Sequence, residues 1–448
     1  MRARLSILYF LQFGVWGCYL TCFGQLLGAG GLGRDIAWFY ATVGIVSIIT
    51  PALMGHLADR CVKPVTLLAI CHGVAAAAMT GAWIYVQRHP VLEFRVFFPL
   101  YLLFLAFYMP TMALANTVSF GILKSRGQRP VDAFPSIRVW GTVGFVAAMW
   151  FVNCAYWHDG VFGFAFSDLH PAGQFRFQFT SMQLLCAGIM GVMTALYALS
   201  LPHASLAAGE KNQGRFILLQ GSLWRKFFGN STVRIFLVFA ALSGVCMQIS
   251  NGFATPFISH FTGISEYVGS HASGNATMLF SLSQISEALC LLLVGGALKK
   301  YGIRTVFAVG GLAWGLRFLF FSGGNPSEGL WMLVASMLVY GIGFNFITIA
   351  GHLYMEQVSE KGTVGFGQGV MMLMSNGVGA TAGTLVAGSI INHWCHWEMV
   401  EVGGGSGVMR LFMGEWQWPW LIFGIYALLM TMAWLLFFKK KRGVATSA

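Results

Sequence analysis

Long apolar stretches recur twelve times along this chain. It has 448 residues, of which 57% are hydrophobic and only 9% are charged, whereas soluble domains usually carry about 25% charged residues. A stretch of about 20 apolar residues is long enough for a helix to cross a bilayer, and a helix satisfies its own backbone hydrogen bonds there. The stretches lie at 5–27, 36–57, 64–86, 96–121, 134–154, 179–201, 233–258, 274–299, 304–321, 329–353, 364–392 and 417–438. The sequence therefore predicts an all-α polytopic membrane protein with twelve transmembrane helices.

Basic residues are distributed unequally between the two sides of the predicted bundle. Of the 27 Lys and Arg residues, 20 fall on the side that holds both termini, five on the opposite side and two inside spans. An excess of Lys and Arg in cytoplasmic loops is usual for membrane proteins. We therefore expect both termini in the cytoplasm. The net charge of +12 reports this topology, and we expect no nucleic-acid partner.

The cysteine and histidine residues do not indicate a metal site. The nine cysteines are scattered, most of them inside spans, without the paired spacing of disulfides or metal ligands. The segment HWCH at 393–396 also lacks the usual ligand spacing. It belongs to one of two long outward loops, at 155–178 and 393–416, and we interpret both as interfacial. We predict no metal and no cofactor.

The chain divides into two similar halves. The longest cytoplasmic loop separates a six-helix bundle at 1–201 from another at 233–448, with 202–232 as the linker. After its second helix each half carries a glycine turn followed by charge: GHLADR at 55–60, and GALKKYGIR at 296–304. In the first copy Gly55 permits close backbone approach, and Asp59 and Arg60 supply charge. Such duplication is typical of secondary transporters, whose substrate site lies between the halves near the bilayer midplane.

Glu287 is the only one of the fifteen Asp and Glu residues that falls at mid-membrane. A carboxyl group there is costly and by default marks a transport path or a proton relay. Other polar and aromatic residues lie at similar depth in spans 5, 7, 8 and 10, several of them spaced to share one helix face. They are Arg138, Thr142, Phe145, Gln248, Asn251, Gln284, Phe344 and Asn345.

This set of side chains suits a neutral ligand that has several hydroxyl groups and a flat ring. Amides bond hydroxyls in both senses, and aromatic side chains cover ring faces. A nucleoside fits these requirements best, and a glycoside with an apolar aglycone fits nearly as well. Each residue also has a structural alternative, because polar groups in spans often bond a neighbouring helix. Arg138 can snorkel to the membrane surface, and we interpret Arg317, near the outer end of its span, as such an anchor.

Several segments resemble the bacterial nucleoside–proton symporter family of the major facilitator superfamily. The glycine-turn element at 55–60 is similar to the superfamily's loop between helices 2 and 3. The segments that resemble the symporter family are LQFGVWG (11–17), YMPT (108–111) with NT (116–117), FPSIRVWGTVGF (134–145), QISN (248–251) and SQISE (283–287). The resemblance implies the major facilitator fold. It also implies a polar nucleoside site made by Arg138, Thr142, Gln248, Asn251, Gln284 and Glu287, with Phe145 and Phe344 against it.

Asn345 departs from the family pattern, which has an Asp linked to proton coupling at this position. Asn has the same shape but cannot ionise. Either Glu287 alone carries the proton, or the protein is an uncoupled nucleoside facilitator. We expect a monomeric importer of nucleosides by proton symport with alternating access. A sugar, glycoside or peptidoglycan-fragment permease is the second hypothesis.

An integral-membrane enzyme is the hypothesis from a different class. Such enzymes usually need several acidic residues at one membrane face to hold a metal ion. Only Glu356 and Glu360 approach this pattern, and they are more simply explained as part of a solvated loop. The sequence therefore predicts a transporter and not an enzyme.

Overall fold

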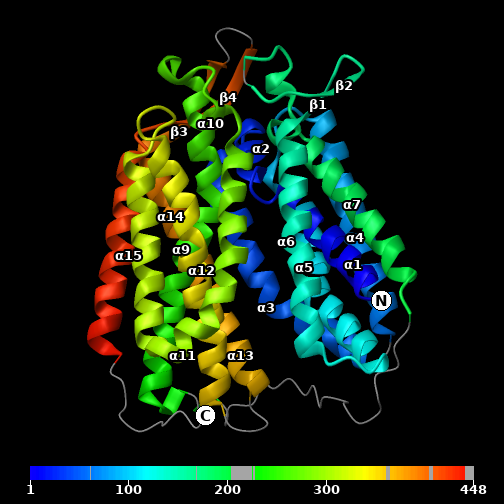
Figure 1. Ribbon diagram of the computed structural model, residues 1–448. Helices are drawn as coiled ribbons and strands as arrows, with labels where there is room; N and C mark the ends of the chain where they lie inside the picture. The colour runs from blue at the N-terminus through cyan, green and yellow to red at the C-terminus, as the bar shows by residue number, and fades with distance from the viewer. Residues whose placement is uncertain are drawn as a thin grey trace.

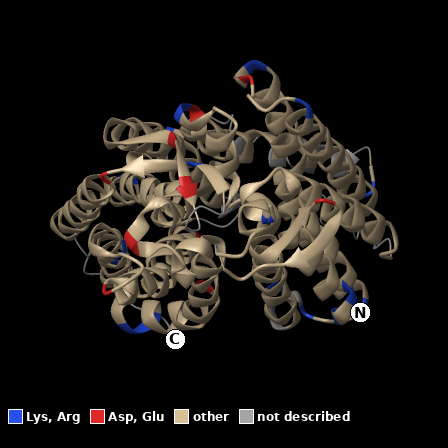
Figure 2. Cartoon of the chain, turned by 90° about the horizontal axis from the view of Figure 1, so that it is seen from above, with Lys and Arg blue, Asp and Glu red and all other residues tan. Residues whose placement is uncertain are grey.

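Two groups of long helices lie side by side and meet at one end, beneath two small β-hairpins (Figure 1). The structure is a computed structural model that describes residues 1–60, 62–167, 169–202, 224–225, 228–359, 364–402 and 407–438. We call the end with the hairpins the hairpin side. Helix α1 begins and helix α15 ends on the opposite side (Figure 1). Seen from above, both groups consist mostly of uncharged ribbon (Figure 2), as the low content of charged residues requires.

The first half supplies six spans. Its helices are α1 (Arg2–Tyr19) continued by α2 (Phe23–Ala29), α3 (Ile36–Arg60), α4 (Pro64–Arg88), α5 (Phe94–Ser125), α6 (Pro130–Cys154) and α7 (Met182–Leu199). Both α4 and α6 begin with proline at the first turn, where the missing N–H costs nothing and the fixed φ favours the helix. The predicted spans of this half are confirmed as helices.

The second half repeats this number of spans with longer helices. They are α9 (Ser231–His260), the short α10 (His271–Gly274), α11 (Ala276–Gly323), α12 (Leu330–Val358), α13 (Val364–Met372), a π-helical segment (Leu373–Gly379), α14 (Ala380–Trp394) and α15 (Gln417–Phe437). Ten helices among the described residues are long and apolar enough to cross a membrane. Helix α11, with 48 residues, holds two spans, and the 25-residue α3 supplies the twelfth.

The backbone of α11 turns at Gly302. The prediction of glycine turns at Gly55 and Gly296 is wrong, because both lie within helices. The backbone is helical through Arg60 in α3 and through Gly296 in α11. Gly302 has φ 73°, a conformation that glycine adopts without the steric cost of a Cβ. The side chains at Asp59 and Arg60 lie outside the described part of the chain, as does most of the linker predicted at 202–232.

Glycines in the eleventh span allow it to pack closely on α9. A Cβ atom on Gly379 would lie 1.8 Å from the carbonyl oxygen of Ala241 in α9, and one on Gly383 would lie 2.6 Å from Val245. Small residues at these positions allow the two helices to approach closely, which is how helices associate in lipid.

The two long outward loops each contain an antiparallel β-hairpin, which the sequence indicated only as loops. Strand β1 (Ala155–His158) pairs with β2 (Val161–Phe164), and Ala155 faces Phe164. Strand β3 (Cys395–Val402) pairs with β4 (Gly407–Gly414), and Cys395 faces Gly414. Adjacent antiparallel strands satisfy each other's backbone groups, so these segments hold a defined shape outside the helices.

Hydrogen bonds join the two halves on the hairpin side. Asn153 Nδ2 at the end of α6 donates to Asn275 Oδ1 at 2.7 Å, and Gln178 Nε2 donates to the carbonyl oxygen of Gly274 at 3.0 Å. From α2, Gln25 Nε2 donates to the carbonyl oxygen of Arg410 in β4 at 2.7 Å. The halves are therefore held together at this end of the molecule.

Trp397 of β3 packs against the first half at two glycines. A Cβ atom on Gly28 or on Gly33 would lie only 2.0 Å from its indole ring. The ring also stacks on Phe412 of β4, with centroids 4.8 Å apart and planes 10° from parallel. The hairpin thus inserts an aromatic side chain into a notch that exists because these two positions lack side chains.

We predict that Gly28→Ala destabilises the protein by crowding Trp397, since packed interiors tolerate added methyl groups poorly. The free energy of unfolding should fall by about 1–3 kcal/mol. The melting temperature of the detergent-purified protein should therefore fall by several degrees. Gly81→Ala is the matched control, because nothing lies within 4 Å of a Cβ there and alanine favours the helix. Adding Trp397→Ala should relieve much of the Gly28→Ala penalty. Equal effects of the two glycine substitutions would contradict the notch.

Candidate functional site

Glu287 faces the interior of the protein and not the lipid. Successive helix residues are separated by about 100°, and the exposure of the residues in the first span of α11 divides it into three faces. Leu292, at 79% exposed, and Leu289 lie on the face open to lipid, and Ser286 lies on a buried face. Gln284 and Glu287 share the remaining face and are partly accessible. Their position away from Leu292 is the one that a central site requires.

Helix α6 has the same three-faced arrangement in the first half. Val139 is 51% exposed and Val143 lies beside it, on the outer face, while Ile137 is fully buried. Arg138 and Thr142, four residues apart, share the remaining face and are partly accessible. The polar pair of α6 therefore corresponds to the polar pair of α11.

Helices α6 and α11 are neighbours across the boundary between the halves, where Trp150 Nε1 donates to Ser281 Oγ at 2.8 Å. Arg138 and Glu287, on these two helices, lie near enough to interact electrostatically. Two opposite charges in a medium of low polarity interact over longer distances than in water. The structure thus brings together the one cation and the one carboxyl that the sequence predicted for the site. Because the two come from different halves, their attraction depends on how the halves are arranged.

Aromatic side chains of the first half hold Arg138 inside the bundle. The Cζ atom of Arg138 lies 4.0 Å from the centre of the Phe13 ring, a cation–π contact. Tyr9 and Tyr108 lie near enough to interact with the same guanidinium, and Tyr9 Oη donates to Asn116 Oδ1 at 2.5 Å. This packing argues against the alternative in which Arg138 extends to the membrane surface.

The two amides of α9 form a pair. Asn251 Nδ2 donates to Gln248 Oε1 at 3.4 Å, and Gln248 Nε2 donates to the carbonyl oxygen of Tyr40 in the first half at 3.5 Å. Gln248 is buried, whereas Asn251 is partly accessible. Asn251 therefore keeps free hydrogen-bonding capacity toward a ligand.

Tyr340 belongs with the predicted residues of α12, and the sequence interpretation missed it. Its ring stacks on Phe344, with centroids 5.9 Å apart and planes 13° from parallel. It also lies near Gln284 and Glu287. The signal was available, because Tyr340 precedes Phe344 by four residues and so shares its helix face.

Asn345 lies behind the site rather than in it. Its side chain is 1% exposed, and Nδ2 donates to the main-chain carbonyl oxygens of Glu287 at 2.8 Å and Gly341 at 3.0 Å. This amide joins α12 to the α11 turn that carries Glu287. Phe145, at 6% exposed, is likewise packed into the hydrophobic core.

Arg317 is fully buried, so its interpretation as a surface anchor is wrong. Its guanidinium donates to Ser250 Oγ at 3.1 Å and to Ser283 Oγ at 3.2 Å. Position within a span does not tell where a long side chain points. Here the serines of neighbouring helices hold it inward.

Comparisons with known proteins identify the family. A sequence model described as nucleoside H+ symporter matches residues 1–443. The chain is 32% identical to the nucleoside permease NupG of Escherichia coli strain K12 over 98% of this chain and 96% of that protein. It is 33% identical to the xanthosine permease of the same strain, over 97% and 95%. The chain belongs to the nucleoside H+ symporter family. It is therefore a multi-pass membrane transporter and not an enzyme.

Solved structures confirm the predicted major facilitator fold of this symporter-family member. The crystal structure of nucleoside transporter NupG superimposes with a TM-score of 0.82 at 31% identity, covering 98% of this chain and 99% of that chain. A bacterial homolog of the lysosomal transporter Spinster gives a TM-score of 0.67 at 14% identity, over 97% and 96%, and shares the fold alone. The resemblance drawn from the sequence is confirmed.

The HWCH segment at 393–396 takes part in the hairpin of this transporter. Cys395 is buried at the start of β3, where burial and the nearby Glu415 raise the pKa of its thiol to about 12. A protonated thiol is a poor metal ligand. His396 Nε2 lies 3.3 Å from Glu398 Oε2 on the exposed surface. Cys395 and His396 therefore make separate local contacts.

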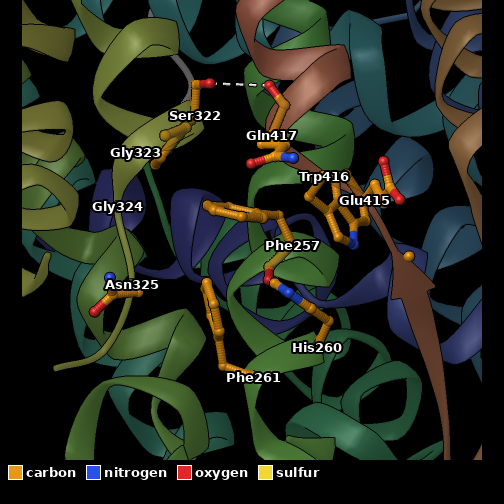
Figure 3. Close-up of a pocket in the computed structure, with 12 residues that line it drawn as sticks. Phe257, His260, Phe261, Ser322, Gly323, Gly324, Asn325, Glu415, Trp416 and Gln417 are labelled. Atoms are coloured by element: carbon orange, nitrogen blue, oxygen red, sulfur yellow. Dashed lines mark hydrogen bonds between the residues drawn. The ribbon is translucent and has the colours of Figure 1, made fainter.

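A cavity of about 280 Å³ opens on the hairpin side, away from Glu287. Figure 3 shows its aromatic wall of Phe257, Phe261 and Trp416, with Ser322 Oγ donating to the carbonyl oxygen of Gln417 at 2.9 Å. The rings pack against one another, and Phe257 and Trp416 have centroids 5.6 Å apart. None of the predicted site residues lines this cavity, so we do not assign it to the transport site.

We predict that Asn345→Ala lowers both stability and uptake. The substitution leaves the carbonyl oxygens of Glu287 and Gly341 without this donor, which costs about 1 kcal/mol, and it frees the turn that carries Glu287. Thermal unfolding in detergent and labelled-nucleoside uptake measure the two effects. Ser359→Ala, at the C-terminal end of α12, removes only a local bond to the carbonyl oxygen of Met355 and should change neither property appreciably. An Asn345→Ala protein with wild-type melting and wild-type uptake would contradict the positioning of Glu287 by this amide.

Proposed function

We propose that this transporter imports nucleosides together with protons across the bacterial cytoplasmic membrane. The observation that supports this most directly is that α6 and α11, from different halves, are neighbours joined by Trp150 Nε1 donating to Ser281 Oγ at 2.8 Å. They carry Arg138 and Glu287 near enough to interact electrostatically, among accessible amide and hydroxyl groups. Alternating access moves the two halves of a transporter around a site near the midplane. Groups contributed by both halves, facing each other, are what such a site requires. Because one chain supplies both sides, the transporter can work as a monomer.

The proposed orientation puts the hairpins outside the cell. The side where α1 begins and α15 ends carries the excess of Lys and Arg, and such an excess marks the cytoplasmic face. The hydrogen bonds between the halves at the hairpin end then hold the outer side closed. A nucleoside bound at Glu287 would leave this conformation on the inner side.

In this proposal the nucleoside is held by two kinds of contact. The ribose hydroxyls and the base edge bond to Arg138, Thr142, Gln248, Asn251 and Gln284. The ring of Phe344, with Tyr340 stacked behind it, covers the base. Phe145 supports α6 from within the core. Polar groups committed to bonding hydroxyls discriminate strongly against ligands that lack them.

Glu287 carries the proton in this scheme. The ionised carboxylate attracts Arg138 and draws the halves together, and protonation removes that attraction. Proton binding therefore changes the relative free energy of the two arrangements, which is what coupling requires. Asn345 cannot ionise and instead bonds the main chain of Glu287, so Glu287 acts without a second mid-membrane carboxyl.

Uptake into proteoliposomes tests the proposed function. Labelled uridine, adenosine and xanthosine should accumulate several-fold more when the outside is acidic than when no pH gradient is imposed, because protons then flow inward with the substrate. A protonophore should abolish the difference. Unlabelled nucleosides should compete, and glucose or maltose should not. Equal uptake with and without the gradient would instead identify an uncoupled facilitator, and competition by sugars alone would identify a sugar permease.

We predict that Glu287→Gln abolishes the response to the pH gradient. Glutamine keeps the shape and hydrogen-bonding groups of the protonated acid but cannot release a proton. Gradient-driven uptake should fall at least about tenfold, which corresponds to a loss of roughly 1.4 kcal/mol of driving free energy. Exchange of internal for external nucleoside, which needs no net proton movement, should fall less. Glu356→Gln, at an exposed glutamate near the end of α12, is the matched control.

Gln284→Ala should also depress uptake strongly, in this case through substrate binding. The change removes a polar neighbour of Tyr340 and a proposed contact to the nucleoside. Its KM should rise while the response to the pH gradient persists, which separates it from Glu287→Gln. Wild-type uptake by either variant would contradict the site assignment.

A further inference from the structure

Arg317 is a buried cation in the second half that has no role in the proposed transport site. It lies in the second span of α11 and is 0% exposed. No ion pair with a carboxylate is found for it among the described residues. A charged side chain inside a membrane protein is costly and commonly functional, so its surroundings require an explanation.

The guanidinium of Arg317 donates hydrogen bonds to residues of three other spans. Nε donates to Ser250 Oγ of α9 at 3.1 Å, and Nη1 donates to Ser283 Oγ in the first span of α11 at 3.2 Å. Nη1 also donates to the main-chain carbonyl oxygen of Ser336 in α12, and Ser336 Oγ returns a hydrogen bond to the carbonyl oxygen of Arg317 at 3.0 Å. The planar guanidinium, with its fixed fork of donors, suits such a junction of several helices.

Aromatic rings provide the remaining compensation for the charge. The Cζ atom of Arg317 lies 4.8 Å from the centre of the Tyr340 ring, 4.9 Å from that of Phe321 and 5.7 Å from that of Phe280. Cation–π contacts of this kind strengthen when they are removed from water. The charge of Arg317 is therefore stabilised by neutral hydrogen-bond acceptors and aromatic rings.

Three partners of Arg317 adjoin residues of the proposed nucleoside site. Ser250 precedes Asn251, and Ser283 precedes Gln284. On α12, the ring of Tyr340 lies between the guanidinium and Phe344, because it contacts both. Adjacent helix residues point about 100° apart, so fixing the serines on the buried faces fixes the directions in which Asn251 and Gln284 project.

We propose that Arg317 is the positioning residue that sets the second half's contribution to nucleoside binding, by holding α9, the first span of α11 and α12 in one fixed arrangement. The proposal rests on the proposed function. It assigns no contact between Arg317 and the nucleoside. Arg317 affects binding by fixing the positions of Asn251, Gln284 and Tyr340. A displacement of about 1 Å in these side chains would weaken binding.

The test compares Arg317→Met and Arg317→Lys with the unaltered full-length protein. Methionine fills much of the same space without charge or donors, and lysine keeps the charge but not the fork. Arg304→Met is the matched control, because Arg304 lies on the same helix and donates to the carbonyl oxygen of Leu435 in α15, away from the site. Equilibrium binding of labelled uridine and adenosine, expressed per folded molecule, is the main readout. KM and Vmax in proteoliposomes and the melting temperature accompany it.

We expect Arg317→Met to raise the Kd for nucleoside at least about tenfold and KM in parallel, with a smaller change in Vmax. Arg317→Lys should restore part of the affinity, and Arg304→Met should leave Kd within about twofold of wild type. A purely structural role would lower the melting temperature or the yield of folded protein and leave Kd per folded molecule unchanged. That result would overturn the proposal.

Ser283→Ala provides the same test without leaving a large void, should Arg317→Met fail to fold. It removes one acceptor of the guanidinium next to Gln284, and it should raise Kd by about three- to tenfold. An unchanged Kd in Ser283→Ala would likewise overturn the role of Arg317. Absence of nucleoside binding by the unaltered protein would be a different failure, since it would overturn the proposed function itself.

Discussion

The proposed transport site depends on two opposite charges inside the bundle, one on each half of the molecule. Arg138 and Glu287 attract each other between the halves, where low polarity makes the attraction stronger and longer in range than on a wet surface. An isolated charge at this depth would be expensive. The opposite charge and the accessible polar groups around them reduce that cost, and they make the fit of the two halves sensitive to the protonation of one carboxyl.

The two halves support this pair in different ways. In the first half, Arg138 stacks on Phe13 at 4.0 Å, with tyrosines nearby. In the second, the support is polar: Asn345 bonds the main chain of Glu287 at 2.8 Å, and Arg317 ties together the serines behind the site. A hydrogen-bonded frame fixes directions more closely than apolar packing does. The half that carries Glu287 is thus the half with the more directional support.

Particular residues show where prediction from the sequence succeeded. Gln284 and Glu287 were predicted to share a face because they are three residues apart in a helix, and the structure has them on one accessible face of α11. Arg138 and Thr142 follow the same rule on α6. Helical periodicity is a local property, so these pairs could be derived without knowing the fold. Tyr340 obeys the same rule with respect to Phe344, and only its aromatic ring was overlooked.

Other residues could not have been placed in this way. Asn345 lies next to Phe344 in the chain but points behind the site, because its direction is set by packing of α12 on α11. Arg317 was interpreted as a surface anchor, since nothing local reveals that Ser250 and Ser283 lie beside it. The contact of Trp397 with Gly28 joins segments more than 360 positions apart, and the turn of α11 falls at Gly302 rather than Gly296.

The sequence by itself determined the membrane class, the number of spans, the family and the helix faces that carry polar residues. These follow from hydropathy, helical repeat and motif, each of which acts within one span. The tertiary structure decided which polar faces meet, which buried groups support them and which end of the molecule is closed. Those outcomes depend on contacts between helices distant in the chain, whose free energy is gained only once the helices have packed.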